Sequence, residues 1–504
     1  MKKYLIILAA CFLATSCGKD LLVEQPKAPN AADFYNNTAD LALASNGLYA
    51  LINVAFNQVA GWATCYGSDD VAAFKGGNKL SFSDFDLFNP NSSNDRMTNW
   101  WSGFYATIKS CNSMIIGYTK ADAPDDIKNN AAGQAYFLRA LSYFYLTRVW
   151  GAIPLTTDNE VDYARPKAQP ADIYALIVAD LQQAETMLPD SWNGNALVTH
   201  AFQNGVNTAP TAGSAKALLA NVYLTMAGWP LKQTDKYALA AAKAKEVIDN
   251  HSKYNVDLLP DFANLWLKEY KYNEEAVFAC YYNPAVPNTP WNQWNMLGPN
   301  SSQPGDELGW DDWFGEINFF NAFPSGPRKD ATYQSVYMVN GVPKDWTATA
   351  MKHPYFRKMR DDESYNPVTH AGNWAGGRTV YIIRYAETLL TYAEAQAMSA
   401  GPDATAYAAI NAVRGRAGTG DLVPGLSASV FKDSVVAERG WEFAGLEANA
   451  RWCDLQRTET VAKVNQNRNP GDEKLRNIPD DATHTYYWAP IPINDATLNP
   501  GIGN

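Results

Sequence analysis

Tryptophan residues flanked by amide and carboxylate side chains are the part of this 504-residue chain best suited to molecular recognition. Two such groups, Trp291-Asn-Gln-Trp294 and Trp310-Asp-Asp-Trp313, lie in one long stretch, and an earlier stretch ends in a similar group. An indole ring can stack on the apolar C–H face of a sugar, while Asn, Asp, Gln or Arg side chains orient the hydroxyl groups. The candidate ligand-binding residues are Trp291, Trp294, Trp310, Trp313, Arg96, Asn99 and Trp100, together with Trp62 and Tyr66.

A core position is the competing interpretation for each of these tryptophans, because most tryptophan side chains in proteins are largely buried. Both interpretations stay open for Trp291, Trp294, Trp310 and Trp313. Four further tryptophans lie within helical patterns and are assigned to packing: Trp101, Trp150, Trp441 and Trp452.

Signatures of the common catalytic sites are missing from the sequence. No metal-ligand spacing connects the histidines, which are His200, His251, His353, His370 and His484. There is no phosphate-binding Gly-Lys-Ser/Thr loop, dinucleotide fingerprint or Gly-x-Ser-x-Gly elbow. The sequence pattern does not exclude a glycoside hydrolase, because the two catalytic carboxylates of such an enzyme are defined by their separation in space and not by their spacing in the sequence. We expect no catalytic residue, no metal and no cofactor, although a structural calcium ion is left open.

Periodic apolar positions predict a mainly helical protein. Residues 404–416 follow helical spacing, and Asp403 is placed to cap that helix. A preceding helix over about 383–399 stops at Gly401-Pro402, because glycine can adopt the left-handed cap conformation and proline cannot continue a helix; together the two helices match a tetratricopeptide (TPR) unit of about 34 residues. Further helices are expected over 101–118, 127–150, 171–188, 213–228, 237–250 and 430–444. We therefore predict an all-α dominated, TPR-like scaffold of about four helix pairs with a few short strands.

Two stretches, 62–100 and 283–370, break the helical pattern. Both combine glycine, asparagine and aspartate with many aromatic residues, and we interpret them as long loops with short strands. Long loops in a compact protein are usually functional or disordered, and disordered segments contain few aromatic residues. We expect the ligand-binding site on these loops.

The N-terminus has the pattern of an export signal. Two lysines precede an apolar run over 4–14, which is too short to cross a bilayer that needs about 20 residues. No later stretch is long enough either, so we expect no membrane-spanning helix. Ala14-Thr15-Ser16-Cys17 looks like a lipobox, which would make Cys17 the acylated first residue once 1–16 are removed; ordinary cleavage without a lipid is the alternative. Residues 17–504 are then expected to form one unit held at the membrane by lipid alone.

The exported chain is acidic and contains few cysteines. Without the two lysines of the signal it has 39 basic and 52 acidic residues, a net charge of about −13, and no dense basic cluster. Nucleic acid and anionic lipid are therefore not expected partners. Disulfides and free buried thiols both stay open for the cysteines after the lipobox, which are Cys65, Cys111, Cys280 and Cys453.

Several charged residues in the predicted helices are expected to form buried structural pairs. They are Arg139, Arg384, Arg414 and Arg451, with Glu387, Glu394, Glu438 and Glu442 as their partners. A catalytic role for these carboxylates is the alternative.

Six segments of the chain, in order, resemble the SusD/RagB family of surface lipoproteins. They are Trp101–Tyr105, Ala135–Ala140 with the following Gly151–Leu155, Ala215–Gly228, Tyr381–Gly418, Glu438–Arg457, and Ala489–Pro492 with Asn499-Pro500. The acidic pair that often follows the lipid cysteine in this family is replaced here by Gly18-Lys19-Asp20, and the predicted binding loops match no family segment.

The resemblance implies a TPR-like lipoprotein of the outer membrane, displayed on the cell surface. It implies that the protein binds a nutrient oligosaccharide and delivers it to a SusC-like TonB-dependent transporter, acting as a lid without performing chemistry. Capture of peptides, which some family members perform, and a purely structural gating role are the alternatives.

Overall fold

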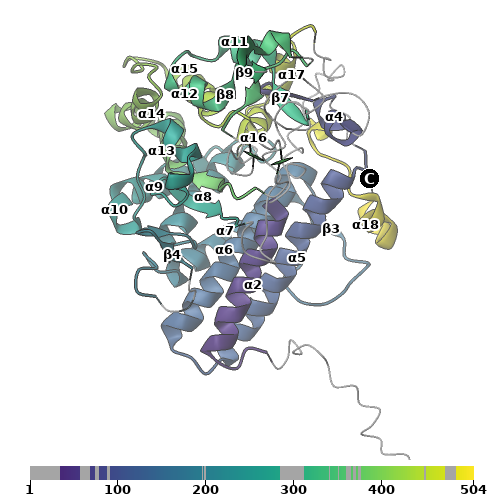
Figure 1. Ribbon diagram of the computed structural model, residues 1–504. Coiled ribbons are helices and arrows are strands. Elements are labelled where there is room, and N and C mark those ends of the chain that lie inside the picture. The colour runs from purple at the N-terminus through teal and green to yellow at the C-terminus, as the bar shows by residue number, and fades with distance from the viewer. Residues whose placement is uncertain are drawn as a thin grey trace, which may run out of the picture.

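The computed structural model describes residues 34–56, 68–73, 79–87, 91–195, 197, 200–283, 311–339, 341–349, 351–358, 365–366, 371–372, 376–445, 447, 450–471 and 484–503. Long helices form most of it (Figure 1). They are α2 (Thr38–Phe56), α5 (Asp95–Gly117), α6 (Asp125–Trp150), α7 (Pro170–Met187), α8 (Ala212–Ala227), α9 (Lys236–Asp249), α13 (Tyr385–Ala400), α14 (Ala404–Arg416) and α15 (Ala428–Glu442).

Consecutive long helices pack against each other as pairs. Helix α5 packs on α6, α6 on α7, α8 on α9, and α13 on α14, while α13 also contacts α9 and so connects the C-terminal pair to the earlier ones. Figure 1 shows α2, α5 and α6 side by side along their length. This arrangement of helix pairs confirms the predicted helical architecture, with boundaries close to those read from the sequence.

Local sequence signals explain where several helices begin and end. The Asp403 side chain accepts a hydrogen bond from the backbone N–H of Ala406 at 2.8 Å, which confirms the predicted cap of α14. Gly401 follows α13 with a φ of 96°, a conformation that favours glycine. At the start of α8, Thr211 and Ser214 form a reciprocal capping box. Helix ends are thus set by nearby residues.

Helix α2 was not predicted from the sequence. Among the described helices it is the one that is long and apolar enough to cross a membrane by length and composition, so the expectation that no later stretch is long enough was wrong. Its residues Leu41, Leu48 and Ile52 are buried, and it packs against α5 and α6. A core helix passes the same test of length and composition.

Many short elements lie in the upper part of Figure 1, beside the long helices α14 and α15, and we call this part the upper layer. The short helices of the structure are α4 (Leu80–Asp86), α10 (His251–Tyr254), the 3₁₀ helix η5 (Phe262–Trp266), α11 (Ile317–Ala322), α12 (Pro327–Thr332), α16 (Ala450–Arg457), α17 (Val461–Asn465) and α18 (Ile493–Leu498). The described strands pair in antiparallel twos: β1 (Val71–Ala73) with β7 (Trp313–Gly315), β2 (Ile153–Pro154) with β3 (Lys167–Ala168), β4 (Phe202–Gln203) with β5 (Val206–Asn207), β6 (Ala276–Cys280) with β14 (Val380–Arg384), β8 (Tyr333–Gln334) with β11 (Tyr355–Phe356), β9 (Val336–Val339) with β10 (Val342–Asp345), and β12 (Tyr365–Asn366) with β13 (Ala371–Gly372).

One large apolar core includes residues from Tyr35 to Ile502, and two smaller clusters form around Phe262 and around Phe314. The tryptophans that the sequence assigned to packing are buried, except that Trp441 is partly buried and packs against Phe319 and Phe323. Three of the cysteines, Cys111, Cys280 and Cys453, are free thiols, and Cys65 lies outside the described residues.

The predicted Arg–Glu pairs are confirmed in part. Arg384 pairs with Glu442 at 2.6 Å, and Arg414 pairs with Glu438 at 2.9 Å. The other predicted groups have different partners: Arg139 with Asp180, Arg451 with Asp69, Glu387 with Arg439, and Glu394 with Arg457. The sequence therefore identified charges that are ion-paired in the interior or close to it, whereas the choice of partner depends on how the helices pack.

Candidate ligand-binding site

The β1–β7 ribbon joins the two loop regions in which the sequence placed the binding residues. Its register sets Val71 opposite Gly315 and Ala73 opposite Trp313. Strand β1 belongs to the first region and β7 to the second, more than 200 residues later along the chain. Paired strands lie about 5 Å apart, so Ala73 and Trp313 lie together at one end of the ribbon, and Asp312 directly precedes Trp313 in the chain.

Two cations and one carboxylate surround the Phe82 ring at that end of the ribbon. We call Lys79, Phe82, Arg96 and Asp312 the loop-site cluster. The Lys79 ammonium group is ion-paired with Asp312, and the Arg96 guanidinium group lies 4.8 Å from the centroid of the Phe82 ring. A guanidinium group over an aromatic face is attracted by the negative face of the ring. The cluster thus holds Arg96 in place through Phe82 beneath it.

The electrostatics of the cluster depend on burial. Burial raises the pKa of the Asp312 carboxyl group, while the positive charges of Lys79 and Arg96 oppose that shift. The Lys79 and Asp312 side chains are 11% and 5% exposed, whereas the Arg96 side chain is 26% exposed. Arg96 is therefore the charged group of the cluster that reaches the surface.

Helix α5 adds a neighbouring polar group on the same face. Asn94 caps the helix by accepting hydrogen bonds from the backbone N–H groups of Arg96 and Met97. Arg96 and Asn99 lie three residues apart in the first turns of α5, a spacing that places side chains on one helical face. Asn99 is exposed. Together these two side chains offer guanidinium and amide donors and an amide acceptor to a ligand.

The α4–α5 connection is held by amide hydrogen bonds. The Asp84 carboxylate accepts hydrogen bonds from the side-chain amides of Asn91 at 3.0 Å and Asn94 at 3.3 Å. Burial raises the pKa of Asp84, and the hydrogen bond from Asn94 lowers it. Among the described residues, no group of three or more His, Cys, Asp or Glu side chains could hold a metal ion. The described Asp84 contacts are thus amide contacts that fix the position of α4.

Two of the predicted ligand-binding tryptophans are core residues in the structure. Trp100 is 1% exposed and packs against Phe56 and Phe104, and Trp313 is 0% exposed and meets Phe82 edge to face at 5.8 Å. The prediction of a free stacking surface is therefore wrong for both. Phe104 lies one helical turn after Trp100, but the partners Phe56 and Phe82 are far from Trp100 and Trp313 along the chain and could not be identified from the local sequence.

Trp100 also shows where the predicted loop region ends. The sequence placed 62–100 in a loop, but α5 begins at Asp95 and its first turns contain Arg96, Asn99 and Trp100. Asparagine and aspartate at 94 and 95 act as a helix start and not as loop residues.

The remaining predicted site residues lie outside the described residues. They are Trp62, Tyr66, Trp291, Trp294, Trp310 and the lipidation candidate Cys17. Their roles stay predictions.

Sequence reasoning missed Lys79, Phe82 and Asp312. Asp312 lies between Trp310 and Trp313, which were selected, so the sequence alone could have identified it as a candidate site residue. The partners Lys79 and Asp312 are separated by 233 residues, and no local pattern connects them.

A second group of charged residues lies deep in the fold and is closed to ligands. We call Arg328, Arg384, Arg416, Glu275 and Glu442 the arginine–glutamate hub. Arg384 contacts Glu275 at 2.7 Å and Glu442 at 2.6 Å, and Arg328 contacts Glu442 at 2.9 Å. Each of these side chains is 3% exposed or less. The hub connects β6, β14, α12, α14 and α15.

The hub lacks the properties of an acid–base pair. Burial alone would raise the pKa of Glu442, but Arg416, Arg384 and Arg328 outweigh it and hold that pKa far below its ordinary value. A general acid needs a pKa close to the working pH and access to a substrate. The predicted structural role of Arg384 and Glu442 therefore fits the geometry better than the catalytic alternative.

Two family models match this chain. The model described as "SusD family" matches residues 274–504, and the model described as "Starch-binding associating with outer membrane" matches residues 68–224. The SusD-like protein P2 of Formosa agariphila is 29% identical over 537 residues, which cover 100% of this chain and 99% of that protein. These matches extend along nearly the whole sequence.

Solved structures show the same fold. A SusD homolog from Bacteroides thetaiotaomicron is 22% identical, covers 94% of this chain and 97% of its own, and superimposes with a TM-score of 0.76. A laminarin binding SusD-like protein is 23% identical, covers 92% and 98% of the two chains, and has a TM-score of 0.75. The similarity confirms the all-α dominated, TPR-like scaffold. Together, the family models and the relatives support a protein of the SusD/RagB family.

Proposed function

We propose that this protein captures a nutrient oligosaccharide at the loop-site cluster and delivers it to a SusC-like TonB-dependent transporter. The observation that supports the proposal is the β1–β7 ribbon, which joins both loop regions, together with the contacts of Phe82 with Trp313 of that ribbon and with Arg96. A solved relative described as laminarin binding supports a glycan as the ligand. The family supports the transporter, and the lipobox at Cys17 supports a lipid anchor in the outer membrane with the protein facing the cell surface.

Recognition would combine hydrogen bonds with aromatic stacking. Arg96 and Asn99 supply donors and an acceptor for sugar hydroxyl groups, and Asp312 with Lys79 keeps Arg96 in place. Trp291, Trp294 and Trp310 are proposed to stack on the sugar rings. The affinity is expected to be modest, with Kd values from about micromolar to millimolar, or about −8 to −4 kcal/mol, because the ligand must be released to the transporter.

Affinity electrophoresis tests this proposal. The soluble form beginning at Gly18 would be run through gels that contain plant, host or microbial polysaccharides. Retardation in one glycan, lost in the Trp291→Ala, Trp294→Ala, Trp310→Ala triple variant, is the expected result. If no glycan retards the protein and titration of peptide mixtures releases heat, the ligand is a peptide and not a glycan. Retardation that is unchanged in the triple variant would remove the tryptophans from the site.

A further inference from the structure

A pocket of about 330 Å³ lies between η5 and α12, away from the loop-site cluster. Its polar lining residues are Asp261, Asp330, Arg357 and Arg378, and its apolar lining includes Trp266 and Leu267. The volume falls at the lower end of the range for small-molecule sites, which is about 300–1,000 Å³. The pocket is therefore large enough for one compact ligand group.

Two of the four charged groups at this pocket, those of Arg357 and Asp330, are not used by the described part of the fold. Within the part of the chain that the structure describes, the guanidinium group of Arg357 and the carboxylate of Asp330 have no hydrogen-bond or ion-pair partner. They line the same pocket but do not pair with each other, so their charged atoms are more than 4.0 Å apart. A ligand group can therefore reach both.

The two arginines are positioned by the backbone around them. Arg378 donates a hydrogen bond through Nη1 to the carbonyl oxygen of Trp266. The backbone N–H of Arg357 donates to the carbonyl oxygen of Thr332 at 2.9 Å, directly after the β8–β11 ribbon. The next residue, Lys358, is buried and ion-paired with Glu447. Arg357 thus occupies a fixed backbone position at the pocket while its own side chain stays available.

The chemistry of the lining selects an anion that also carries hydroxyl groups. An arginine fork binds a carboxylate or a sulfate through two parallel hydrogen bonds. The Asp330 carboxylate is an acceptor for hydroxyl groups, and Leu267 and the Trp266 side chain give an apolar wall for a C–H face. Two carboxylates and two guanidinium groups make the pocket nearly neutral, so the acidic net charge of the chain does not decide its preference.

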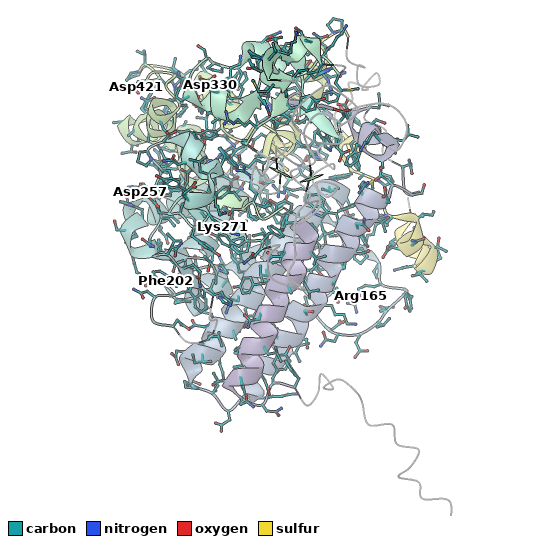
Figure 2. All side chains as sticks on the ribbon, in the orientation of Figure 1. Arg165, Phe202, Asp257, Lys271, Asp330 and Asp421 are labelled. Carbon is teal, nitrogen blue, oxygen red and sulfur yellow. The ribbon has the colours of Figure 1, made fainter. Side chains whose placement is uncertain are left out.

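We propose that this pocket is a second carbohydrate subsite that binds an anionic sugar residue, either a uronate or a sulfated hexose. The proposal rests on glycan capture as the proposed function and adds the class of sugar that the protein selects. Figure 1 shows α12 and α4 on opposite sides of the upper layer, and Figure 2 shows Asp330 near the outer edge of the molecule on the α12 side. The subsite is therefore separate from the loop-site cluster.

Calorimetry on the detergent-solubilised full-length protein tests the subsite. The probes are trigalacturonate for a carboxylated sugar, a κ-carrageenan hexasaccharide for a sulfated sugar, and laminarihexaose for a neutral one. Arg357→Ala is expected to weaken binding of one anionic probe by about ten- to a hundredfold, the loss typical of a hydrogen-bonded charged group. Arg357→Lys is expected to recover only part of it, because lysine lacks the planar fork.

Controls separate this proposal from the one it rests on. Lys344→Ala removes an exposed positive charge on β10 and is expected to leave both anionic and neutral binding unchanged. Arg357→Ala is expected to leave laminarihexaose binding unchanged. The subsite is overturned if wild type binds neutral but not anionic probes, or if Arg357→Ala leaves anionic binding intact or weakens all probes equally. Absence of binding to every glycan overturns the proposed function and the subsite with it.

Discussion

The arginine–glutamate hub and the loop-site cluster are both built from charged side chains, but they differ in how far those side chains are shielded from solvent. In the hub, Arg384 is ion-paired with the carboxylates of Glu275, Glu442 and Glu447. In the loop-site cluster, Asp312 is ion-paired with Lys79, while Arg96 packs on the Phe82 ring and lies 3.6 Å from the exposed Asp95. The hub side chains are 3% exposed or less, whereas the cluster keeps Arg96, which is 26% exposed, at the surface.

The difference teaches which charges hold the scaffold and which can take part in recognition. A buried ion pair contributes little net stability, but removal of one partner is costly because the other charge stays buried and uncompensated. The hub fastens α12 to α14 and α15 in this way. The cluster is smaller, partly exposed and located where two loop regions meet, so its loss should affect binding more than folding.

Arg384→Ala is expected to have the largest effect. It removes a cation that contacts Glu275, Glu442 and Glu447, and Arg416 and Lys358 then have to compensate these carboxylates without it. The expected loss in the free energy of unfolding is about 3–5 kcal/mol. Urea denaturation followed by circular dichroism measures it. Arg96→Ala is the matched variant and is expected to cost less than about 1 kcal/mol, because Arg96 is partly exposed. Equal losses in the two variants would remove the distinction between hub and cluster.

Trp313→Ala tests the distinction between tryptophans that stabilise the core and tryptophans that are proposed to bind the glycan. Because Trp313 is fully buried against Phe82, its truncation is expected to reduce the free energy of unfolding by about 3–5 kcal/mol. Trp310→Ala is expected to weaken glycan retardation with little change in stability. Thermal unfolding and affinity electrophoresis of both variants give the answer. A stable Trp313→Ala protein would contradict the core assignment.

The sequence predicted those parts of the fold that depend on local physics. The apolar period, the Asp403 cap and the turn at Gly401 located α13 and α14 within a few residues. Helix α2 was missed because its outward residues Leu43 and Val54 are apolar as well, so no polar face marks the helix.

The candidate site was predictable in its region but not in its members. Arg96 and Asn99 were selected as ligand-binding residues, and the structure shows both in the first turns of α5 with Arg96 against Phe82, while their role in binding stays a prediction. Trp100 and Trp313 were selected for their type, and their burial depends on aromatic partners far along the chain. The Lys79–Asp312 pair requires the β1–β7 register, which no single stretch of sequence contains.

Asp312→Asn tests whether the cluster positions Arg96 for a ligand. The amide removes the negative charge that pairs with Lys79 and attracts Arg96, while it keeps the size of the side chain. We expect about tenfold weaker glycan binding, the loss of a hydrogen bond to a charged group, and unchanged unfolding. Titration calorimetry with the retained glycan measures it. Glu442→Gln is the contrasting variant, and it is expected to destabilise the fold instead.

Acidification is expected to give the smallest of these effects and to act on the cluster and on the hub at different pH values. Burial raises the pKa of Asp312, so on acidification it takes up a proton in the folded protein before its unfolded counterpart does, which weakens the Lys79 pair without a loss of folding free energy. The arginines lower the pKa of Glu442, so its contribution to stability is present above its ordinary value of about 4.3 and is lost as the pH falls below it. As the pH falls toward the ordinary carboxyl range, we therefore expect binding to weaken before the urea midpoint begins to fall. In Asp312→Asn the decline in binding should be smaller, since the titrating group is gone. Binding and stability that fall together over the same pH range would show that the hub and the cluster are one cooperative unit.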